Sequence, residues 1–507
     1  MRRPGREPVP GVRRAAVGRA GRRGPGARTA RGGHRGSVAV LGVRVGVARD
    51  HAAADHDGRV PGRVHGRREA LGRPARGRDR GGAPGRGGPD GGALAGRGRR
   101  GLPVGLLSTY PLVDHHCHGV VTRDLDRAGL EALLSEGGAP ADGESNFDTP
   151  LGLAIRRHCA PLLDLPVHAP VAEYLERRAS LGAEEVARRF LGATGTARYL
   201  VDTGFNASGL TSPAELAVLG GGSASEIVRL ESVAEAVAAA GVEPSEFGDV
   251  FRSSLARVVA EVGAVGVKSV AAYRTGFRLD PSPPSPAEVS AAAARWLWSR
   301  GAGDGGAAGA GGADGGGAGG AGGGGGGGGE AVGGGGGGWR LAEPVLQRMT
   351  LEAAIELGLP IQFHVGFGDS DIRMTEVDPT LLSDWIRRHR VPVMLLHCWP
   401  FQRQASFLAH VFPNVYVDVG LALHYVGPRR GVEVLAEVAE VTPFSRLLYS
   451  SDAYGAPELY ALGAHGFRVA LEALLTDRVE SGEWSASDAD RIGHLIAHGN
   501  AERVYRL

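Results

Sequence analysis

Short runs of apolar residues recur along the chain from about residue 100, and longer segments with helical periodicity separate them. Eight runs of this kind occur, at 111–118, 198–205, 226–231, 263–273, 360–366, 391–399, 414–421 and 446–453. Runs of this length, rich in Val and Leu, are typical of parallel strands that are buried on both faces. Strands that alternate with helices predict an α/β fold, and eight of them predict a (β/α)8 or TIM barrel.

An open, doubly wound sheet is the alternative architecture. That fold carries a glycine-rich fingerprint in its first strand-to-helix turn, whereas His118-Gly119-Val120 follows the first run here. The glycine-rich stretch 301–338 has neither the Lys-Ser/Thr ending nor the preceding apolar strand of a phosphate-binding loop. We therefore favour the barrel.

Two segments of the chain show no apolar periodicity. Residues 1–100 consist mainly of Arg, Gly, Pro and Ala, and such a composition buries too little surface to offset the entropy of ordering. Residues 301–338 are almost all glycine and predict a flexible tether. We expect a disordered extension over 1–100, which we interpret as spurious upstream translation. One (β/α)8 barrel is expected over 101–507, with 301–338 as a low-complexity insertion.

The formal net charge of +2 hides the contrast between the Arg-rich extension and an acidic body. The extension lacks the aromatic residues that stack on bases, so we do not expect nucleic-acid binding. No run of about eighteen apolar residues occurs, so no membrane span is expected. The three cysteines, Cys117, Cys159 and Cys398, are too few for a disulfide framework or a thiolate metal cage. We expect a cytoplasmic protein with a small-molecule substrate, and homo-oligomerisation is left open.

The first apolar run leads into a cluster of histidines. Alternation along a strand places Asp114, His116 and His118 on one face, and His115 and Cys117 on the other. Two imidazoles on the same face, about two residues apart, can reach one metal ion. For either histidine alone, a hydrogen-bonded core position is the alternative, but the pair beside an aspartate favours a metal site.

In a barrel, the carboxyl ends of the strands converge on one site. The ends of the predicted strands supply His116, His118, Lys268, His364, His397 and Asp452. Lys268 is the single lysine among 57 Lys and Arg residues. Because Arg does not replace a compact amine of tunable pKa, this lysine is expected to be needed as a lysine. The joint placement of these residues predicts a metal centre.

Other residues near the strand ends have weaker claims. On a regular fourth strand, Arg274 shares the face of Lys268 and could bind a substrate carboxylate, while Tyr273 faces away. Trp399 shares the parity of His397 and could line the pocket, with core packing as the alternative. Four further polar residues could orient ligand histidines: Asp202, Glu231, Asp418 and His424.

The motifs together resemble the amidohydrolase superfamily. The resemblance lies in the Asp-x-His-x-His of the first strand, the histidines of strands five and six, and the aspartate of strand eight. The closing GNAERVY, residues 499–505, resembles the last helix of the amidohydrolase-2 branch. The stretches VDHHCHG, GVKSVAAYR, QFHVGFGD and YSSDA resemble the amidohydrolase domain that occurs alone or fused to glutamine-synthetase-like domains.

The resemblance implies a hydrolase that uses a bound metal, usually Zn²⁺, to activate water. His116, His118 and His364 are the expected ligands, with Asp452 as a ligand and general base. His397 is expected either to bind a second ion or to assist as an electrophile. Lys268 is expected to be either a carbamylated bridge between two ions or a free amine for a substrate carboxylate, and one ion per chain is favoured.

The expected reaction is cleavage of an amide or related C–N bond of a small carboxylate-bearing substrate. A metal-dependent, non-oxidative decarboxylase of an aromatic acid is the first alternative, because this branch contains decarboxylases with the same ligands. A non-catalytic barrel that binds a glutamine-synthetase-like partner is the second, although the complete ligand set argues against it. Release of an amine or ammonia would separate the hydrolase from the decarboxylase, which releases carbon dioxide.

Overall fold

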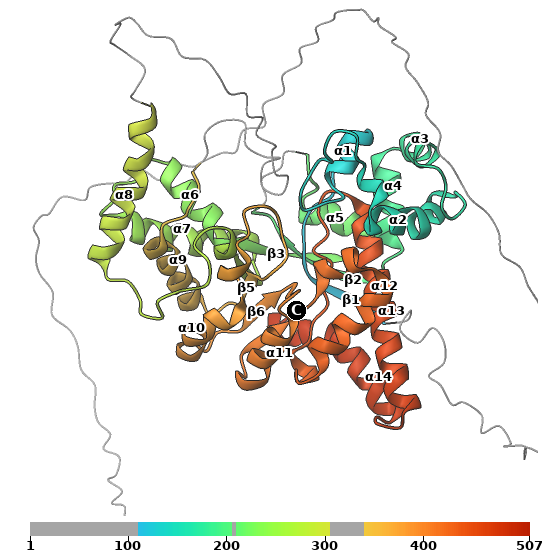
Figure 1. Cartoon of the computed structure of the whole chain (residues 1–507). Helices are drawn as coiled ribbons and strands as arrows, with labels where there is room; N and C mark the ends of the chain where they lie inside the picture. Colours follow the sequence, from blue (N-terminus) through green and yellow to red (C-terminus); the bar gives the residue numbers. More distant parts are fainter. Residues whose placement is uncertain (1–109, 205–208, 305–338) are drawn as a thin grey trace, which may run out of the picture. The chain divides into compact units, whose positions relative to one another are not determined.

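The computed structural model describes residues 110–204, 209–304 and 339–507 (Figure 1). The chain divides into two units, Met1–Gly92 and Ala93–Leu507, and all described residues belong to the second. The predicted extension over 1–100 and most of the predicted insertion over 301–338 lie outside the described residues, so both stay predictions.

Seven parallel strands form one sheet, in the order in which they occur along the chain. The strands are β1 (Leu112–Cys117), β2 (Thr196–Asp202), β3 (Ser223–Arg229), β4 (Gly266–Ser269), β5 (Ile361–His364), β6 (Val393–Leu396) and β7 (Val415–Val417). Every residue of β1, β4, β5 and β6 is buried. Their continuous apolar sequences therefore reflect a sheet that is covered on both faces.

An irregular segment takes the place of the predicted eighth strand and closes the sheet. On one side, Leu448 N donates to the Val417 carbonyl of β7 (2.9 Å). On the other side, Asp452 N donates to the His116 carbonyl of β1 (3.0 Å). The two edges of the sheet are joined in this way, so the predicted (β/α)8 barrel is confirmed. The eighth segment differs from the prediction because Asp452 has a φ of 51°, which a regular strand does not adopt.

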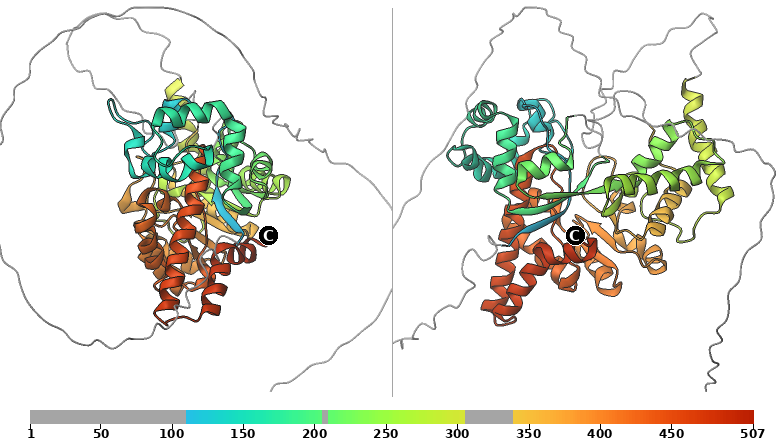
Figure 2. Two further views of the ribbon diagram at one scale, coloured as in Figure 1. Left: turned by 90° about the vertical axis from the view of Figure 1, so that its right-hand side faces the viewer. Right: turned by 180° about the vertical axis from the view of Figure 1, so that it is seen from behind.

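Helices connect successive strands and pack around the sheet (Figures 1 and 2). They are α1 (Arg127–Ala132), α2 (Pro150–Ala154), α3 (Val171–Leu181), α4 (Ala183–Gly192), α5 (Pro213–Gly220), α6 (Leu230–Ala239), α7 (Phe247–Val262), α8 (Pro286–Asp304), α9 (Pro344–Leu357), α10 (Ser383–Arg388), α11 (Gln402–Val411), α12 (Gly420–Ala439), α13 (Pro457–Glu480), α14 (Ala486–His494) and α15 (Asn500–Tyr505). Within the described ranges, no helix combines the length and the hydropathy needed to cross a membrane.

Local sequence explains where several helices begin. Before α5, Ser212 and Glu215 form a capping box in which each side chain binds the other residue's backbone N–H, and Pro213 occupies the first turn. Before α9, the Glu343 carboxylate accepts hydrogen bonds from the N–H groups of Val345 and Leu346. These contacts satisfy backbone donors that have no partner inside the helix.

The barrel interior holds a small apolar core that the C-terminal helix completes. This core comprises Val113, Leu200, Ile227, Met394, Leu396, Leu448, Ala501 and Tyr505. The last two belong to α15, and the C-terminus lies beside the strands in all views (Figures 1 and 2). A second core packs α1–α4 against α13 and the outer side of β1 and β2, and a third, larger core lies beneath helices α6–α13. Helix α15 therefore contacts the same strands that carry the candidate site.

Candidate metal centre

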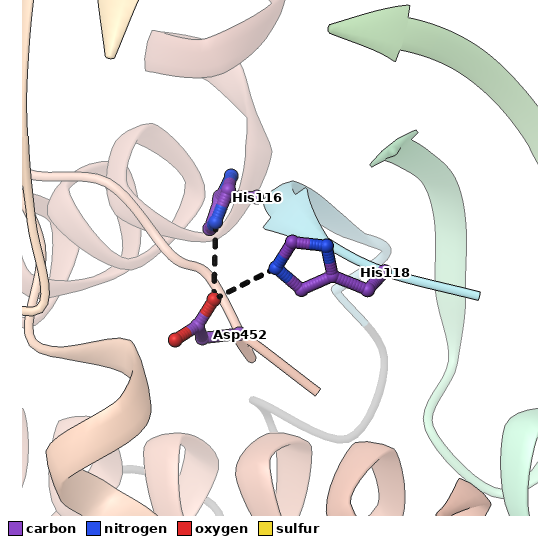
Figure 3. Close-up of side chains that lie close together, drawn as sticks. All are labelled: His116, His118 and Asp452. Atoms are coloured by element: carbon purple, nitrogen blue, oxygen red, sulfur yellow. Dashed lines mark ion pairs between the residues drawn. The ribbon is translucent and has the colours of Figure 1, made fainter. Parts of the chain in front are cut away.

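Two histidines from β1 and one aspartate from the closing segment converge at one point. Nε2 of His116 lies 3.0 Å from Oδ1 of Asp452, and Nε2 of His118 lies 3.5 Å from the same oxygen (Figure 3). One ligand atom from each residue lies within 4.8 Å of the other two. In the described ranges, no other group of three or more His, Cys, Asp or Glu residues brings its ligand atoms this close together.

The hydrogen-bond partner of Nδ1 shows which ring nitrogen of each histidine carries the hydrogen. Nδ1 of His116 lies 2.8 Å from Oε1 of Gln362, and Nδ1 of His118 lies 3.0 Å from the backbone carbonyl of Asp202. Both partners are acceptors, so both histidines donate through Nδ1 and keep a lone pair on Nε2. Two lone pairs therefore face the Asp452 carboxylate with no proton from either ring between them. A cation relieves that repulsion, so the donor set fits a metal ion.

Burial keeps this group in the protonation state that metals bind. It lowers the pKa of His116 to about 3, and the nearby charge of Lys268 acts in the same direction. Burial alone would raise the pKa of Asp452, but its neighbours, His397 first, hold it well below the usual range. At neutral pH the site therefore presents a neutral imidazole at His116 and an ionised carboxylate at Asp452.

Lys268 and His397 border the same three side chains. Nζ of Lys268 lies 3.1 Å from Nε2 of His116, and the amine is buried. Nε2 of His397 lies 3.3 Å from Oδ2 of Asp452. Neither ring nitrogen of His397 has a hydrogen-bond partner in the described part of the chain, although the residue is fully buried. Such a side chain is available to a ligand.

His364 lies next to this group without joining it. Its ring centroid is 4.7 Å from that of His397. Its Nε2, however, lies 2.9 Å from the Phe367 carbonyl and 3.0 Å from the hydroxyl oxygen of Tyr273. The carbonyl accepts, so Nε2 of His364 carries a hydrogen in this arrangement.

Tyr273 contacts His364 although strand alternation predicts that it faces away, so that prediction is wrong. Strand β4 ends at Ser269, and residues Ala271–Tyr273 form a 3-10 turn. The parity of a regular strand no longer applies beyond Ser269. The same turn carries Arg274, whose guanidinium lies 3.7 Å from Glu235.

A bulge in β1 also changes the predicted faces of the histidine cluster. Asp114 pairs with Tyr199 and Cys117 pairs with Val201, so three steps along β1 oppose two along β2. An extra residue of this kind shifts the alternation. Asp114 consequently does not join His116: its Oδ1 accepts from the backbone N–H of Ser451 (2.9 Å).

Asp418 holds the backbone at the end of β6. Its Oδ1 accepts from the backbone N–H of His397 (3.0 Å) and of Gly420 (2.8 Å), and from the hydroxyl group of Ser450 (2.8 Å). His397 has a φ of 69°, in the left-handed region that non-glycine residues rarely adopt. This carboxylate therefore stabilises a strained conformation beside the site.

Three other residues predicted near the site, Trp399, Asp202 and Glu231, make their side-chain contacts elsewhere. Trp399 is half-buried and packs edge-on against Phe367. The Asp202 carboxylate pairs with Arg229 (2.7 Å), so only the backbone carbonyl of Asp202 orients His118. Glu231 binds Ser269 and Gln347 rather than a histidine of the site.

Sequence reasoning missed two polar contributors near the centre. Gln362 shares strand parity with His364, so a polar residue on that face of β5 was a usable signal. Glu136 lies in the connection between β1 and β2, where no local pattern points to it. It accepts a hydrogen bond from Tyr425 (3.3 Å), and burial together with the charges of Asp452 and Asp369 raises its pKa to about 8.

Comparison with known families and curated proteins gives two matches. The sequence pattern of a family described as amidohydrolase matches residues 215–507. Protein fluG of Emericella nidulans is 25% identical over 430 residues, which cover 79% of this chain and 46% of fluG. The chain thus spans about half the length of this curated relative.

Solved structures share the fold. A protein described as a metal-dependent hydrolase from Lactobacillus casei ATCC 334 is 26% identical, with 79% of this chain and 96% of that chain covered and a TM-score of 0.61. Uronate isomerase from Thermotoga maritima is 12% identical, with 79% and 96% covered and a TM-score of 0.50. The likeness to the isomerase is one of fold alone.

Proposed function

Because the chain belongs to the amidohydrolase family, we propose that it is a metal-dependent hydrolase that cleaves an amide or related C–N bond of a small carboxylate-bearing substrate. The convergence of two imidazole lone pairs on the Asp452 carboxylate carries this proposal. The likeness to a metal-dependent hydrolase at 26% identity and a TM-score of 0.61 supports the same class.

We propose that His116, His118 and Asp452 hold one divalent cation. Zn²⁺ is the best match, because in catalytic sites it takes three imidazole or carboxylate ligands and leaves one position for water. When bound, the cation supplies Lewis-acid chemistry, lowering the pKa of a water molecule and polarising a carbonyl group. His364 is proposed as a further ligand, for which its ring has to release the Phe367 carbonyl.

Asp452 is also the proposed general base. Its ionised carboxylate can accept a proton from the attacking water and deliver that proton to the leaving amine. His397 is proposed to donate a hydrogen bond to the oxygen of the tetrahedral intermediate, because neither of its ring nitrogens makes a hydrogen bond in the described ranges, although Nε2 lies 3.3 Å from Oδ2 of Asp452. Trp399 and Arg274 stay weaker proposals for substrate contacts.

Lys268 distinguishes a one-ion site from a two-ion site. We favour one ion, with the buried amine available for a substrate carboxylate. In the alternative, a carbamylated Lys268 and His397 would hold a second ion. The metal content of the purified protein distinguishes these two versions.

The proposal is tested by product analysis on the metal-loaded protein. We expect amine or ammonia release from a panel of carboxylate-bearing amides, loss of that activity on chelation, and recovery on adding Zn²⁺. Asp452→Asn should lower the rate by about 100-fold or more. Carbon dioxide release from aromatic acids, without amine release, would instead support the decarboxylase.

A partner is proposed on separate grounds. The chain spans 46% of fluG, and its motifs resemble a domain that also occurs fused to glutamine-synthetase-like domains. We propose that this chain binds a glutamine-synthetase-like partner. Co-purification of a tagged version of this protein with a glutamine-synthetase-like protein would support the proposal, and exclusive recovery of the single chain would contradict it.

A further inference from the structure

A continuous series of hydrogen bonds joins the C-terminal helix to the candidate metal centre. The hydroxyl group of Tyr505 accepts a hydrogen bond from Nε2 of Gln362 (2.8 Å), and Oε1 of Gln362 lies 2.8 Å from Nδ1 of His116. On its other side, the Tyr505 hydroxyl lies 3.1 Å from Nδ1 of His115, whose Nε2 lies 3.0 Å from Oδ2 of Asp418. All five side chains are buried, away from solvent.

The side-chain amide of Gln362 has one orientation that satisfies its neighbours. Besides Tyr505, its Nε2 donates to the backbone carbonyl of His115 (2.7 Å). A carbonyl oxygen only accepts, so a flipped amide would bring two acceptors together. Oε1 is therefore held toward His116, where it needs a donor. Nδ1 of His116 consequently carries the hydrogen, and Nε2 keeps its lone pair.

The opposite end of the series is determined by the Asp418 carboxylate. Its Oδ1 accepts from three donors, the backbone N–H groups of His397 and Gly420 and the hydroxyl group of Ser450, and its Oδ2 faces Nε2 of His115. A carboxylate oxygen accepts, so His115 donates through Nε2. Nδ1 of His115 forms the next hydrogen bond, with the Tyr505 hydroxyl group, and a lone pair of that oxygen remains for Gln362.

We infer that Gln362 and Tyr505 are positioning residues of the metal centre, and that they act through His116. They fix the Nδ1–H tautomer of His116 and aim its Nε2 lone pair at Asp452 before any ion binds. Partners that fix the tautomer and orientation of a ligand histidine typically raise metal affinity about 10- to 100-fold. The inference rests on the proposed metal-dependent function.

The inference gives helix α15 a role beyond packing. Tyr505 and Ala501 complete the apolar core of the barrel interior, where Tyr505 contacts the strands. The same ring carries the hydroxyl group that holds Gln362. A change at the last turn of the chain is therefore expected to alter the metal centre as well as the packing.

Two variants and one matched control test the inference. Gln362→Leu removes the acceptor for His116, and Tyr505→Phe removes only the hydroxyl group. Tyr174→Phe is the control, because it also deletes a buried hydroxyl group, which donates to Glu458 (3.0 Å) far along the chain from Gln362. Each variant is titrated with Zn²⁺ against a chromophoric chelator, and each metal-free protein is labelled with ¹⁵N-histidine for NMR.

We expect Gln362→Leu to weaken Zn²⁺ binding about 10- to 100-fold and Tyr505→Phe about 3- to 10-fold, with Tyr174→Phe near the parent protein. The NMR spectra should show the Nδ1–H tautomer for His116 in the parent protein and a mixture of tautomers in Gln362→Leu. If Gln362→Leu does not fold, Tyr505→Phe decides the question.

An unchanged affinity in Tyr505→Phe and Gln362→Leu, or an unchanged tautomer in Gln362→Leu, would overturn the inference. Failure of the proposed function looks different: the parent protein and a His116→Asn variant would then bind Zn²⁺ equally weakly. The NMR signature is measured without metal, so it reports on the hydrogen bonds in either case.

Discussion

Nζ of Lys268 lies 3.1 Å from Nε2 of His116, the nitrogen that also faces Asp452 at 3.0 Å. Burial lowers the pKa of Lys268 to about 8, although the charges of Asp202 and Asp452 act in the opposite direction. At neutral pH the group is therefore mostly an ammonium. A divalent cation at His116 would sit beside this positive charge and be repelled by it.

Replacement of this lysine should reveal the number of metal ions. In a one-ion site, Lys268→Met removes the repulsion, so we expect Zn²⁺ affinity to rise by roughly tenfold with one ion per chain retained. Chelator competition measures the affinity, and elemental analysis measures the ion count. A fall from two ions to one would instead identify Lys268 as a bridging ligand.

Histidine variants should separate the ligands by strength. His116→Asn deletes a lone pair that already faces Asp452, and we expect Zn²⁺ affinity to fall by more than about 100-fold, beyond the range of outer contacts. His364→Asn should lower Zn²⁺ affinity less, because Nε2 of His364 must first release the Phe367 carbonyl, which lies 2.9 Å away, before it can bind an ion. The same chelator competition ranks the two, and equal losses would contradict the difference in role.

Much of the site follows from sequence, because barrel geometry brings strand ends together. Asp452 lies far along the chain from His116 and His118, yet each of the three falls at or near the end of a predicted strand. The convergence of these three side chains needed only the order of strands and the rule that their carboxyl ends share one face of the barrel.

The failures arise where the backbone departs from a regular strand. The bulge in β1 separates Asp114 from His116, and the turn after Ser269 brings Tyr273 to His364. Single-sequence patterns contain no signal for either irregularity. The role of Tyr505 is not predicted for another reason. Its hydrogen bond with Gln362 joins residues 143 positions apart in sequence, so the contact depends on the docking of the last helix.

Glu136 should make stability depend on pH. Its pKa in the folded protein, about 8, lies above that of an ordinary glutamate, chiefly because of burial. Between these two values the folded state holds a proton that the unfolded chain releases. Stability should therefore be highest below the ordinary value and decrease as the pH rises through about 8.

Glu136→Gln removes this dependence because the amide stays neutral. In metal-free protein, we expect Tm close to the parent at about pH 4.5 and at least about 2 °C above it at about pH 9. Glu144→Gln, in the same connection but exposed, is the control. Thermal melts at both pH values provide the measurement, and a Tm gain that is equal at the two would refute the assignment.

A buried ion pair connects α3 to the start of α13, six residues beyond Asp452. Nε of Arg178 lies 2.8 Å from Oε1 of Glu458, with the side chains 4% and 0% exposed. Arg178→Met leaves an uncompensated carboxylate in the core, so we expect the free energy of unfolding to fall by about 3–5 kcal/mol in urea denaturation.

Adding Glu458→Gln to Arg178→Met should recover much of that loss, because the amide no longer carries a buried charge and still accepts from Tyr174. Arg257→Met is the matched control: its partner Glu261 lies 2.9 Å away, but both side chains are more than half exposed, so a much smaller change is expected. Similar losses at Arg178 and Arg257 would show that the pair with Glu458 does not hold α3 against the barrel.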